Sequence, residues 1–398
     1  MSRFLFVVPP LVGHINPTVA VAGALTSAGH EVAWVGVPDL VRQLAGPAAH
    51  VFASPLWNLT ALTRTERLRG PAALKMLWEQ FLVPLAELSA PAVRRAVREF
   101  RPAVIVADQQ AFAGGLVADE LGLCWATSAT TTAELVRRPA DMPLVDEWLA
   151  AELAALRERV TGSATGQPMG DPRFSPHLIL AFSTDELTGP LPEYGGALRL
   201  VGPALSDRPA GDFPWAWLDP ARPAILISLG TVSAESSGRF FDACRAAVAQ
   251  RPALQAILVD PNGADLAPTG NLLTRREVPQ MALLPRMRAV LCHAGHNTVC
   301  ESLWHGVPLV VAPIRDDQPI IAGQVVNAGA GIRLRFTRGN AEHIGAAIDA
   351  VLSDPGYADA ARRVGDSLRA AGGSRAAARE LAALAARSSA TSRTGGVR

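Results

Sequence analysis

The chain has 398 residues, of which 49% are hydrophobic and 18% are charged. This length is too great for one compact core of ordinary size and predicts about two domains, while the apolar content excludes wholesale disorder. The 37 basic and 36 acidic residues nearly cancel to a formal charge of +1, so no net field favours nucleic acid or an anionic membrane as a partner.

The cysteines and the apolar segments indicate a protein of the cytoplasm. No paired spacing suggests a zinc site or a disulfide framework, so we interpret all four cysteines as buried thiols: Cys124, Cys244, Cys292 and Cys300. The apolar run at the N-terminus is interrupted by two prolines and is followed by no small-residue cleavage site, which favours a strand over a signal peptide. No stretch reaches the roughly 18 apolar residues of a membrane-spanning helix.

The first part of the chain has the rhythm of parallel α/β units. Residues 4–10 (FLFVVPP) predict a strand, residues 15–30 a helix and residues 31–37 the next strand, and residues 103–108 (AVIVAD) predict a further strand. Strands this apolar are typical of parallel strands covered by helices on both faces.

A second unit of the same kind begins near Pro223. Strands are predicted at residues 224–230, 254–260 and 289–293, with a helix at 237–250. We therefore expect an N-terminal domain, a linker rich in proline, glycine and aspartate, a C-terminal domain and a disordered polar tail; the predicted bounds are 1–204, 205–220, 221–385 and 386–398. The expected fold is α/β, with two doubly wound Rossmann-like domains facing across a cleft and ligands bound at the carboxyl ends of the strands.

The loop and helix after residues 289–293 have the chemistry of a phosphate and ribose site. Asn297 or Thr298 occupies the expected helix cap, so the first-turn amides can bind an anion. Gly295 allows a close backbone approach, and His293 can donate a hydrogen bond or, if protonated, supply positive charge. Glu301, about one turn later, can accept from two ribose hydroxyls.

Two further loops add candidate ligands of the same molecule. Asp317 and Gln318 offer acceptors and donors suited to a sugar ring, and Gly230 with Thr231 are candidate phosphate contacts. Each of these signals is weak alone, because a polar side chain at a strand end is usually only satisfied or solvated. The interpretation as a phosphate and sugar site rests on the order in which these residues occur along the chain.

This order resembles the signature of family 1 nucleotide-diphosphosugar-dependent glycosyltransferases of the GT-B fold. The pattern His-x-Gly-x-x-Thr-x-x-Glu-x-x-x-x-Gly-x-Pro, then Pro-x-x-x-Asp-Gln, is carried here by His293, Gly295, Thr298, Glu301, Gly306, Pro308, Pro313, Asp317 and Gln318. Residues 8–17 and 278–295 also resemble family segments, so the resemblance extends along essentially the whole chain. The sequence is similar to zeaxanthin glucosyltransferases and to macrolide and polyketide glycosyltransferases of actinomycetes.

The resemblance also gives a role to two polar residues of the first unit. His14 follows the first predicted strand, and Asp108 ends the strand at residues 103–108, so they suit a base and its orienting carboxylate. On chemistry alone a structural role for the pair stays open. The resemblance implies that His14 deprotonates an acceptor hydroxyl and that transfer of a hexose is inverting. Because the predicted cleft loops contain no Asp-x-Asp metal motif, we expect that no metal or other cofactor is needed besides the nucleotide sugar.

The donor and the acceptor are predicted less sharply. The Asp317-Gln318 form is typical of relatives that use glucose-like donors and favours UDP-glucose. Glu277 stands where relatives often carry tryptophan, so Val278 and Gln280 are left to bind the base, and a TDP-deoxysugar remains the alternative. The aromatic residues Trp57, Trp78, Phe81 and Phe112 line a lipophilic acceptor site or pack in the core; both interpretations are open.

Other functional classes are less well supported by the sequence. A sugar-nucleotide epimerase would need acidic residues in place of the histidine and aspartate, and a dinucleotide-dependent dehydrogenase would need a Gly-x-Gly-x-x-Gly motif after the first strand. A metal hydrolase using His293 and His296 would lack a third ligand nearby. A non-catalytic nucleotide-sugar-binding protein with the same fold is the rival from another class, and the oligomeric state is not predicted.

Overall fold

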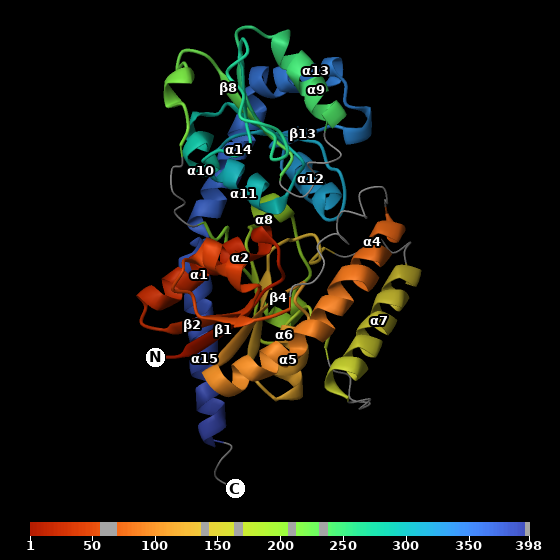
Figure 1. The fold of residues 1–398 in the computed structure, drawn as a ribbon, viewed down its shortest axis with the longest axis vertical. Helices are drawn as coiled ribbons and strands as arrows, with labels where there is room; N and C mark the ends of the chain where they lie inside the picture. Colours follow the sequence, from red (N-terminus) through yellow and green to blue (C-terminus); the bar gives the residue numbers. More distant parts are fainter. Residues whose placement is uncertain (56–69, 137–142, 163–169, 206–211, 231–237, 395–398) are drawn as a thin grey trace. The chain divides into compact units, whose positions relative to one another are not determined.

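The structure is a computed structural model, and it describes all of the chain except residues 56–69, 137–142, 163–169, 206–211, 231–237 and 395–398 (Figure 1). The chain divides into two compact units, which are described separately. Unit 1 contains Met1–Phe182, Leu191–Ser206 and Ala371–Arg398, and unit 2 contains Ser183–Pro190 and Asp207–Ala370.

Unit 1 is built on a parallel sheet of seven strands in the order β3-β2-β1-β4-β5-β6-β7. The strands are β1 (Arg3–Val7), β2 (Glu31–Gly36), β3 (Val51–Ala53), β4 (Val104–Asp108), β5 (Trp125–Ala129), β6 (Ile179–Ala181) and β7 (Leu198–Leu200). The predicted strands at the N-terminus and at residues 103–108 are confirmed, because their apolar runs form the centre of this sheet.

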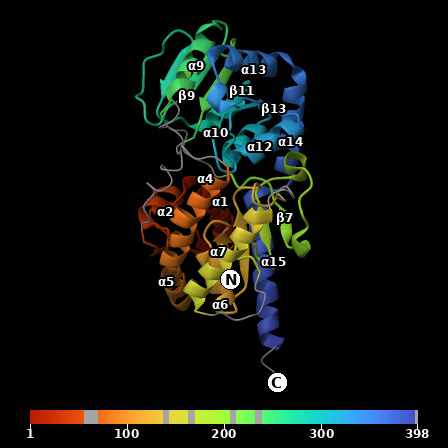
Figure 2. The same ribbon diagram turned by 90° about the vertical axis from the view of Figure 1, so that its right-hand side faces the viewer.

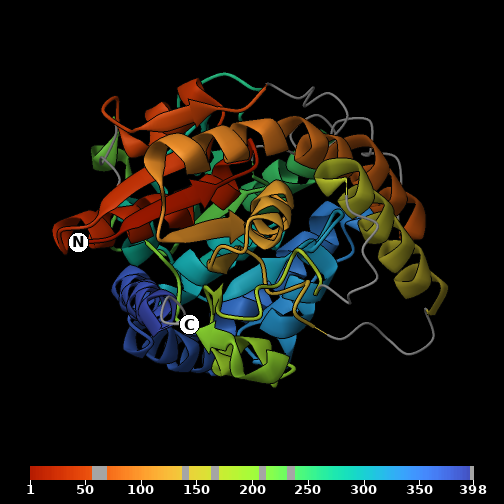
Figure 3. The same cartoon turned by 90° about the horizontal axis from the view of Figure 1, so that it is seen from below.

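Helices cover both faces of the first sheet. Phe4 and Phe6 point toward α1 (Val12–Ser27) and α15 (Gly373–Thr394), while Leu5 and Val7 pack toward α5 (Val83–Phe100) and α6 (Ala113–Glu120). This alternation follows the two-residue period of a strand. Figure 3 shows α5, in orange, on one side of the sheet and α15, in blue, on the other.

A long helical segment flanks this sheet. α4 (Pro71–Leu77) runs through a π-helical turn at Trp78–Leu82 into α5, in agreement with the helical periodicity of this region. α7 (Pro143–Thr161) packs along α5 and α6, and Figure 2 shows α5 and α7 side by side. A second core forms between these helices.

Unit 2 is a parallel sheet of six strands in the order β10-β9-β8-β11-β12-β13. The strands are β8 (Ala224–Ser228), β9 (Gln255–Val259), β10 (Leu272–Arg275), β11 (Ala289–Cys292), β12 (Leu309–Val311) and β13 (Gly331–Arg333). One face packs on α9 (Gly238–Ala249) and α13 (Ala341–Ser353). The other helices of this unit are α8 (Asp185–Thr188), α10 (Gln280–Leu283), α11 (His296–Trp304), α12 (Gln318–Asn327) and α14 (Pro355–Ala370).

The structure confirms two doubly wound parallel α/β domains but changes their boundaries. α15 belongs to unit 1, because Leu381 and Leu384 are buried against α1, and the predicted bound of residue 385 for the second domain is therefore wrong. The expected disorder from residue 386 is also wrong up to Thr394, where α15 ends. Residues 183–190, in turn, belong to unit 2, where α8 packs on α12 and α14.

Candidate active site

In each unit, predicted functional residues follow the two neighbouring strands at which the strand order reverses. These strands are β1 and β4 in unit 1, and β8 and β11 in unit 2. Ligands of doubly wound sheets bind at the carboxyl ends of such strands. His14 and Asp108 occupy this position in unit 1, and Gly230 and His293 occupy it in unit 2.

His14 and Asp108 are in direct contact. α1 begins at Val12, earlier than the predicted residue 15, and His14 lies in its first turn. Nδ1 of His14 is 3.0 Å from both Oδ1 and Oδ2 of Asp108, whose side chain is fully buried, while the His14 side chain is 17% exposed. The structure thus brings together the two residues that the sequence pairs as a base and its orienting carboxylate.

Thr130 and Gln110 complete the surroundings of this carboxylate. The hydroxyl of Thr130, directly after β5, lies 2.8 Å from Nδ1 of His14 and donates to Oδ2 of Asp108 at 3.0 Å. The backbone N–H of Gln110 donates to Oδ1 at 2.8 Å. Neither residue was predicted to support the carboxylate; the available signal was that β5 ends beside β4 with a polar side chain.

In unit 2, the imidazole of His293 lies between two glycines. A Cβ atom at Gly230 would be 2.7 Å from Cε1 of His293, and one at Gly295 would be 2.5 Å from Nε2, so any larger residue would displace the ring. Gly230 also has a φ of 73°, in the left-handed region that favours glycine. Thr231, the predicted neighbour of this site, lies outside the described residues.

Burial lowers the pKa of His293 to about 4, against an opposing effect of Asp317. The ring is therefore neutral near pH 7 and can act as a hydrogen-bond donor or acceptor. Of the two predicted possibilities for His293, a hydrogen bond to an anion is compatible with this environment and a positive charge near neutral pH is not.

The helix after β11 begins earlier than predicted. Gly295 is the N-cap of α11, so the prediction that Asn297 or Thr298 caps the helix is wrong, and both lie in its first turn. Because glycine has no side chain to cap these amides, the helix start keeps the anion-binding character expected of it.

The predicted ribose and base residues are brought together. Glu301 is 2% exposed and accepts a hydrogen bond of 2.6 Å from Nε2 of Gln280. Gln280 begins α10, and its backbone N–H donates to the carbonyl of Val278 at 2.8 Å. Gln280 therefore holds the orientation of the Glu301 carboxylate.

Gln318 has a structural duty that the sequence did not show. Its Oε1 accepts from the backbone N–H groups of Ile314 and Arg315, at 2.8 and 3.1 Å. Asp317 directly precedes α12 but makes no side-chain cap. The carbonyl of Gln318 thus fixes the loop after β12, and its amide nitrogen is the group suited to a sugar ligand.

Comparison with known proteins shows which proteins this chain is similar to. A family model described as UDP-glucoronosyl and UDP-glucosyl transferase matches residues 205–367. The chain is 28% identical to 4'-demethylrebeccamycin synthase of Lentzea aerocolonigenes, over 93% of this chain and 96% of that protein. It is 29% identical to elloramycin glycosyltransferase ElmGT of Streptomyces olivaceus, over 92% and 93%. The crystal structure of the kitacinnamycin glycosyltransferase superposes with a TM-score of 0.78 at 24% identity, covering 96% of this chain and 99% of that one.

The chain is a glycosyltransferase of the GT-B fold. The resemblance to family 1 glycosyltransferases that the sequence predicts is confirmed, by the family model over residues 205–367 and by the relatives over more than nine tenths of the chain. The matches span nearly the full length of the relatives, so they include both units of this chain.

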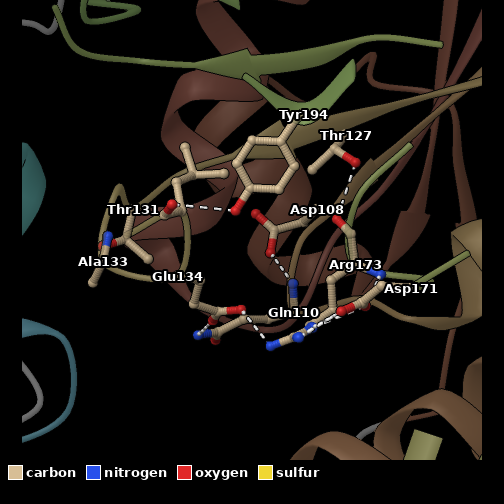
Figure 4. A network of polar contacts seen from close by, with 10 residues as sticks. Asp108, Gln110, Thr127, Thr131, Ala133, Glu134, Asp171, Arg173 and Tyr194 are labelled. Atoms are coloured by element: carbon tan, nitrogen blue, oxygen red, sulfur yellow. Dashed lines mark hydrogen bonds and ion pairs between the residues drawn. The ribbon is translucent and has the colours of Figure 1, made fainter. Parts of the chain in front are cut away.

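A second polar network extends from Asp108 of the glycosyltransferase (Figure 4). The side-chain amide of Gln110 donates to Oε1 of Glu134 at 3.3 Å, and Nη1 of Arg173 lies 3.7 Å from Oε2 of Glu134. Arg173 also donates to both carboxylate oxygens of Asp171. Burial raises the pKa of Glu134, while Arg173 and Gln110 oppose this shift. No local sequence pattern marks these residues, which come from separate segments.

The predicted acceptor-lining aromatics are core residues in this structure. Trp78, Phe81 and Phe112 are 3%, 1% and 1% exposed, and they belong to one hydrophobic cluster. The ring centroids of Trp78 and Phe112 are 5.1 Å apart, and the Arg173 guanidinium lies 5.4 Å from the Trp78 ring centre. Of the two interpretations, packing is the one observed, because none of the three presents an open face. Trp57 lies outside the described residues.

Two further features of the glycosyltransferase bear on its partners. Among the residues that the structure describes, no group of three histidine, cysteine, aspartate or glutamate side chains is placed to hold a metal ion, and metal independence stays a prediction. No helix in the described parts of the chain is long and apolar enough to cross a membrane. The predicted cytoplasmic location is not tested by either observation.

Proposed function

We propose that this glycosyltransferase transfers glucose from UDP-glucose to a hydroxyl of a lipophilic natural-product acceptor, with inversion at the anomeric carbon. The observation that carries the proposal is the contact of His14 with the buried carboxylate of Asp108, at 3.0 Å, at the carboxyl ends of β1 and β4. This is the geometry in which a carboxylate orients an imidazole as a general base.

The proposed chemistry uses these two residues in one step. Nε2 of His14 takes the proton of the acceptor hydroxyl, and Asp108 stabilises the imidazolium that forms. The acceptor oxygen bonds to the anomeric carbon from the face opposite the diphosphate. The bond from that carbon to the diphosphate oxygen breaks, and UDP leaves with the electron pair.

The diphosphate is proposed to bind at the start of α11. Backbone amides of the first turn, at Asn297 and Thr298, are suited to an anion, and the glycines Gly230 and Gly295 allow a close approach beside neutral His293. Preorganised amide dipoles stabilise the charge that develops on a leaving group. This arrangement performs the task of a divalent cation, so we propose that the reaction needs no metal.

The rest of the donor is proposed to bind along the neighbouring loops of unit 2. Glu301, held by Gln280, is the acceptor for ribose hydroxyls, and the backbone of Val278 is the partner for the base. Asp317 and the amide nitrogen of Gln318 are assigned to the hexose hydroxyls. The description of the matching family model names both UDP-glucoronosyl and UDP-glucosyl transfer, which supports a UDP-sugar donor.

A TDP-deoxysugar is the second candidate donor, and one observation favours it. The carbonyl of Gln318 is already bonded to Ile314 and Arg315. The side-chain carbonyl of Gln318 therefore stays hydrogen-bonded even when the donor lacks one hydroxyl. This avoids part of the penalty of about 1–3 kcal/mol that is expected for an unpaired buried polar group.

A transfer screen tests the proposal. The purified protein is mixed with EDTA, UDP-glucose or TDP-glucose, and lipophilic phenols and alcohols that include 4-methylumbelliferone, and products are identified by mass spectrometry. We expect a glycoside to form in EDTA with the wild-type protein and to be absent with His14→Ala.

The outcomes separate the rival functions. A product that forms equally well with His14→Ala would show that His14 is not the base. Consumption of TDP-glucose alone would favour a TDP-linked donor over a UDP-linked one, and failure to bind either nucleotide sugar would overturn donor binding in unit 2. Binding without transfer to any acceptor of the panel would favour a non-catalytic nucleotide-sugar-binding protein.

A further inference from the structure

We propose that Thr130 is a positioning residue for the pair formed by His14 and Asp108: its hydroxyl donates to the carboxylate and accepts from the imidazole, so that it fixes both. This inference rests on the proposed function, because it adds a positioning residue to the proposed catalytic pair. No local feature of the sequence distinguishes Thr130 from the two threonines that follow it.

The hydrogen-bond geometry determines the direction of each bond. A threonine hydroxyl carries one hydrogen, and an ionised carboxylate only accepts. The hydrogen of Thr130 therefore points to Oδ2 of Asp108, at 3.0 Å between the oxygens. The contact of 2.8 Å between Oγ1 of Thr130 and Nδ1 of His14 then requires a hydrogen on Nδ1. The neutral ring consequently has Nε2 unprotonated, which is the form that a base needs.

The same hydroxyl fixes the rotation of the carboxylate. Both Asp108 oxygens are 3.0 Å from Nδ1 of His14, and each has one other donor. The backbone N–H of Gln110 holds Oδ1, and the hydroxyl of Thr130 holds Oδ2. Among the residues that the structure describes, Thr130 is thus the side-chain donor to this carboxylate besides His14, and its hydroxyl can be removed by substitution.

Burial strengthens these hydrogen bonds. Asp108 is 1% exposed and Thr130 is 4% exposed, so water screens their interaction only weakly. The three residues come from the ends of adjacent strands: His14 follows β1, Asp108 ends β4 and Thr130 follows β5. The sheet itself sets the spacing of the three groups.

Loss of the hydroxyl should change the titration of His14. In Thr130→Val, Oδ2 of Asp108 would keep the imidazole as its remaining partner, so the protonated ring is favoured. The lost acceptor contact to Nδ1 acts in the opposite direction, but the hydrogen on Nδ1 is shared with the two carboxylate oxygens, so the loss of this contact is the smaller effect. We expect the titration midpoint of His14 to rise by roughly half a pH unit.

NMR titration of the histidine rings measures this shift without any turnover. His14→Ala assigns the His14 signal, Thr130→Val tests the hydroxyl, and Thr130→Ser should restore the wild-type midpoint. Thr127→Val is the matched control, because Thr127 is also buried on this strand segment but its hydroxyl donates to the carbonyl of Arg173 at 3.0 Å. An unchanged midpoint in Thr130→Val would overturn the inference.

Kinetics provide a second, separate readout. With UDP-glucose and 4-methylumbelliferone, we expect Thr130→Val to lower kcat by roughly three- to tenfold and Thr130→Ser to retain it. In an Asp108→Ala background, Thr130→Val should lower the rate less than it does in the wild type, because its contact with the carboxylate is already lost and only its contact with the imidazole remains. An equal loss in both backgrounds would mean that Thr130 contacts the substrates directly and is not a positioning residue.

The two proposals fail in different ways. If neither the wild-type protein nor any variant transfers glucose, the proposed function fails, while the NMR titration still decides the role of Thr130. If His14→Ala abolishes transfer but Thr130→Val titrates like the wild type, only the assignment of Thr130 is wrong.

Discussion

The imidazole of His293 occupies a space that exists because two neighbouring residues lack side chains. Gly295 has φ −64° and ψ 134°, a conformation that alanine adopts freely, so Gly295→Ala would act only through its Cβ, 2.5 Å from Nε2 of His293. We expect the displaced ring to weaken UDP binding about tenfold, or about 1.4 kcal/mol. Titration calorimetry with UDP measures this change.

Gly323→Ala is the matched control for this prediction. A Cβ at Gly323 meets no atom within 4 Å, and the residue lies inside α12. Alanine should raise the free energy of unfolding by about 0.5–1 kcal/mol there and leave UDP affinity unchanged. Wild-type affinity in Gly295→Ala would show that UDP binding does not depend on the position of His293.

The low pKa of His293 predicts a pH dependence of stability. Its value of about 4 in the folded protein, set mainly by burial, lies below the ordinary 6.5. As the pH falls from about 6.5 to 4, the unfolded chain gains a proton that the folded chain does not, so stability is lost in this window, by up to about 3 kcal/mol. His293→Gln should lose less stability between pH 7 and 4.5, measured by urea unfolding. Equal losses would contradict the assignment.

The sequence predicted the central residues of the site but not their supports. His14 and Asp108 could be paired because polar residues that end neighbouring parallel strands meet at one edge of a sheet. Thr130, Glu134 and Arg173 could not be chosen in this way, because their contacts depend on side-chain directions and on segments that approach only in the folded chain. The sequence around a threonine does not show whether its hydroxyl supports a catalytic group or is solvated.

At the scale of elements, the segment around Arg173 connects the carboxylates to the helical core. Arg173→Met would leave the half-buried charge of Glu134 without its cation, and we expect a loss of roughly 3–5 kcal/mol in the free energy of unfolding. Adding Glu134→Gln should recover part of this loss, because the amide still accepts from Gln110. Denaturant unfolding measures both. If the double variant is as unstable as the single one, the loss comes from the ion pair with Asp171 or from packing on Trp78, and not from the charge of Glu134.

The elements themselves were predicted where their pattern is local. Strands such as Arg3–Val7 and Ala224–Ser228 are apolar except for one terminal residue each, and such runs indicate parallel strands buried on both faces. The end of α15 was not predicted, because its alanine, arginine and serine residues resemble a polar tail. The residues of α15 up to Ala385 pack in one core with α1, which lies near the opposite end of the sequence, and such long-range packing leaves no local signal.

At the scale of the whole molecule, the two units have separate hydrophobic cores although the chain passes between them after residues 182, 190, 206 and 370. Leu381 is fully buried in the core of unit 1. We expect Leu381→Ala to destabilise that unit by about 2–5 kcal/mol, even though this residue follows all of unit 2 in the sequence. Calorimetric unfolding should show one transition lowered and the other unchanged.

UDP should raise the unfolding transition of unit 2. Because the proposed nucleotide site lies entirely in unit 2, UDP at one hundred times its Kd should stabilise that unit by about 2.7 kcal/mol. The same increase is expected in Leu381→Ala and in His14→Ala, since both changes lie in unit 1. A shift of the transition that Leu381→Ala lowers would place the nucleotide in unit 1 and contradict the donor assignment. A shift of both transitions together would show that the two cores unfold as one cooperative unit.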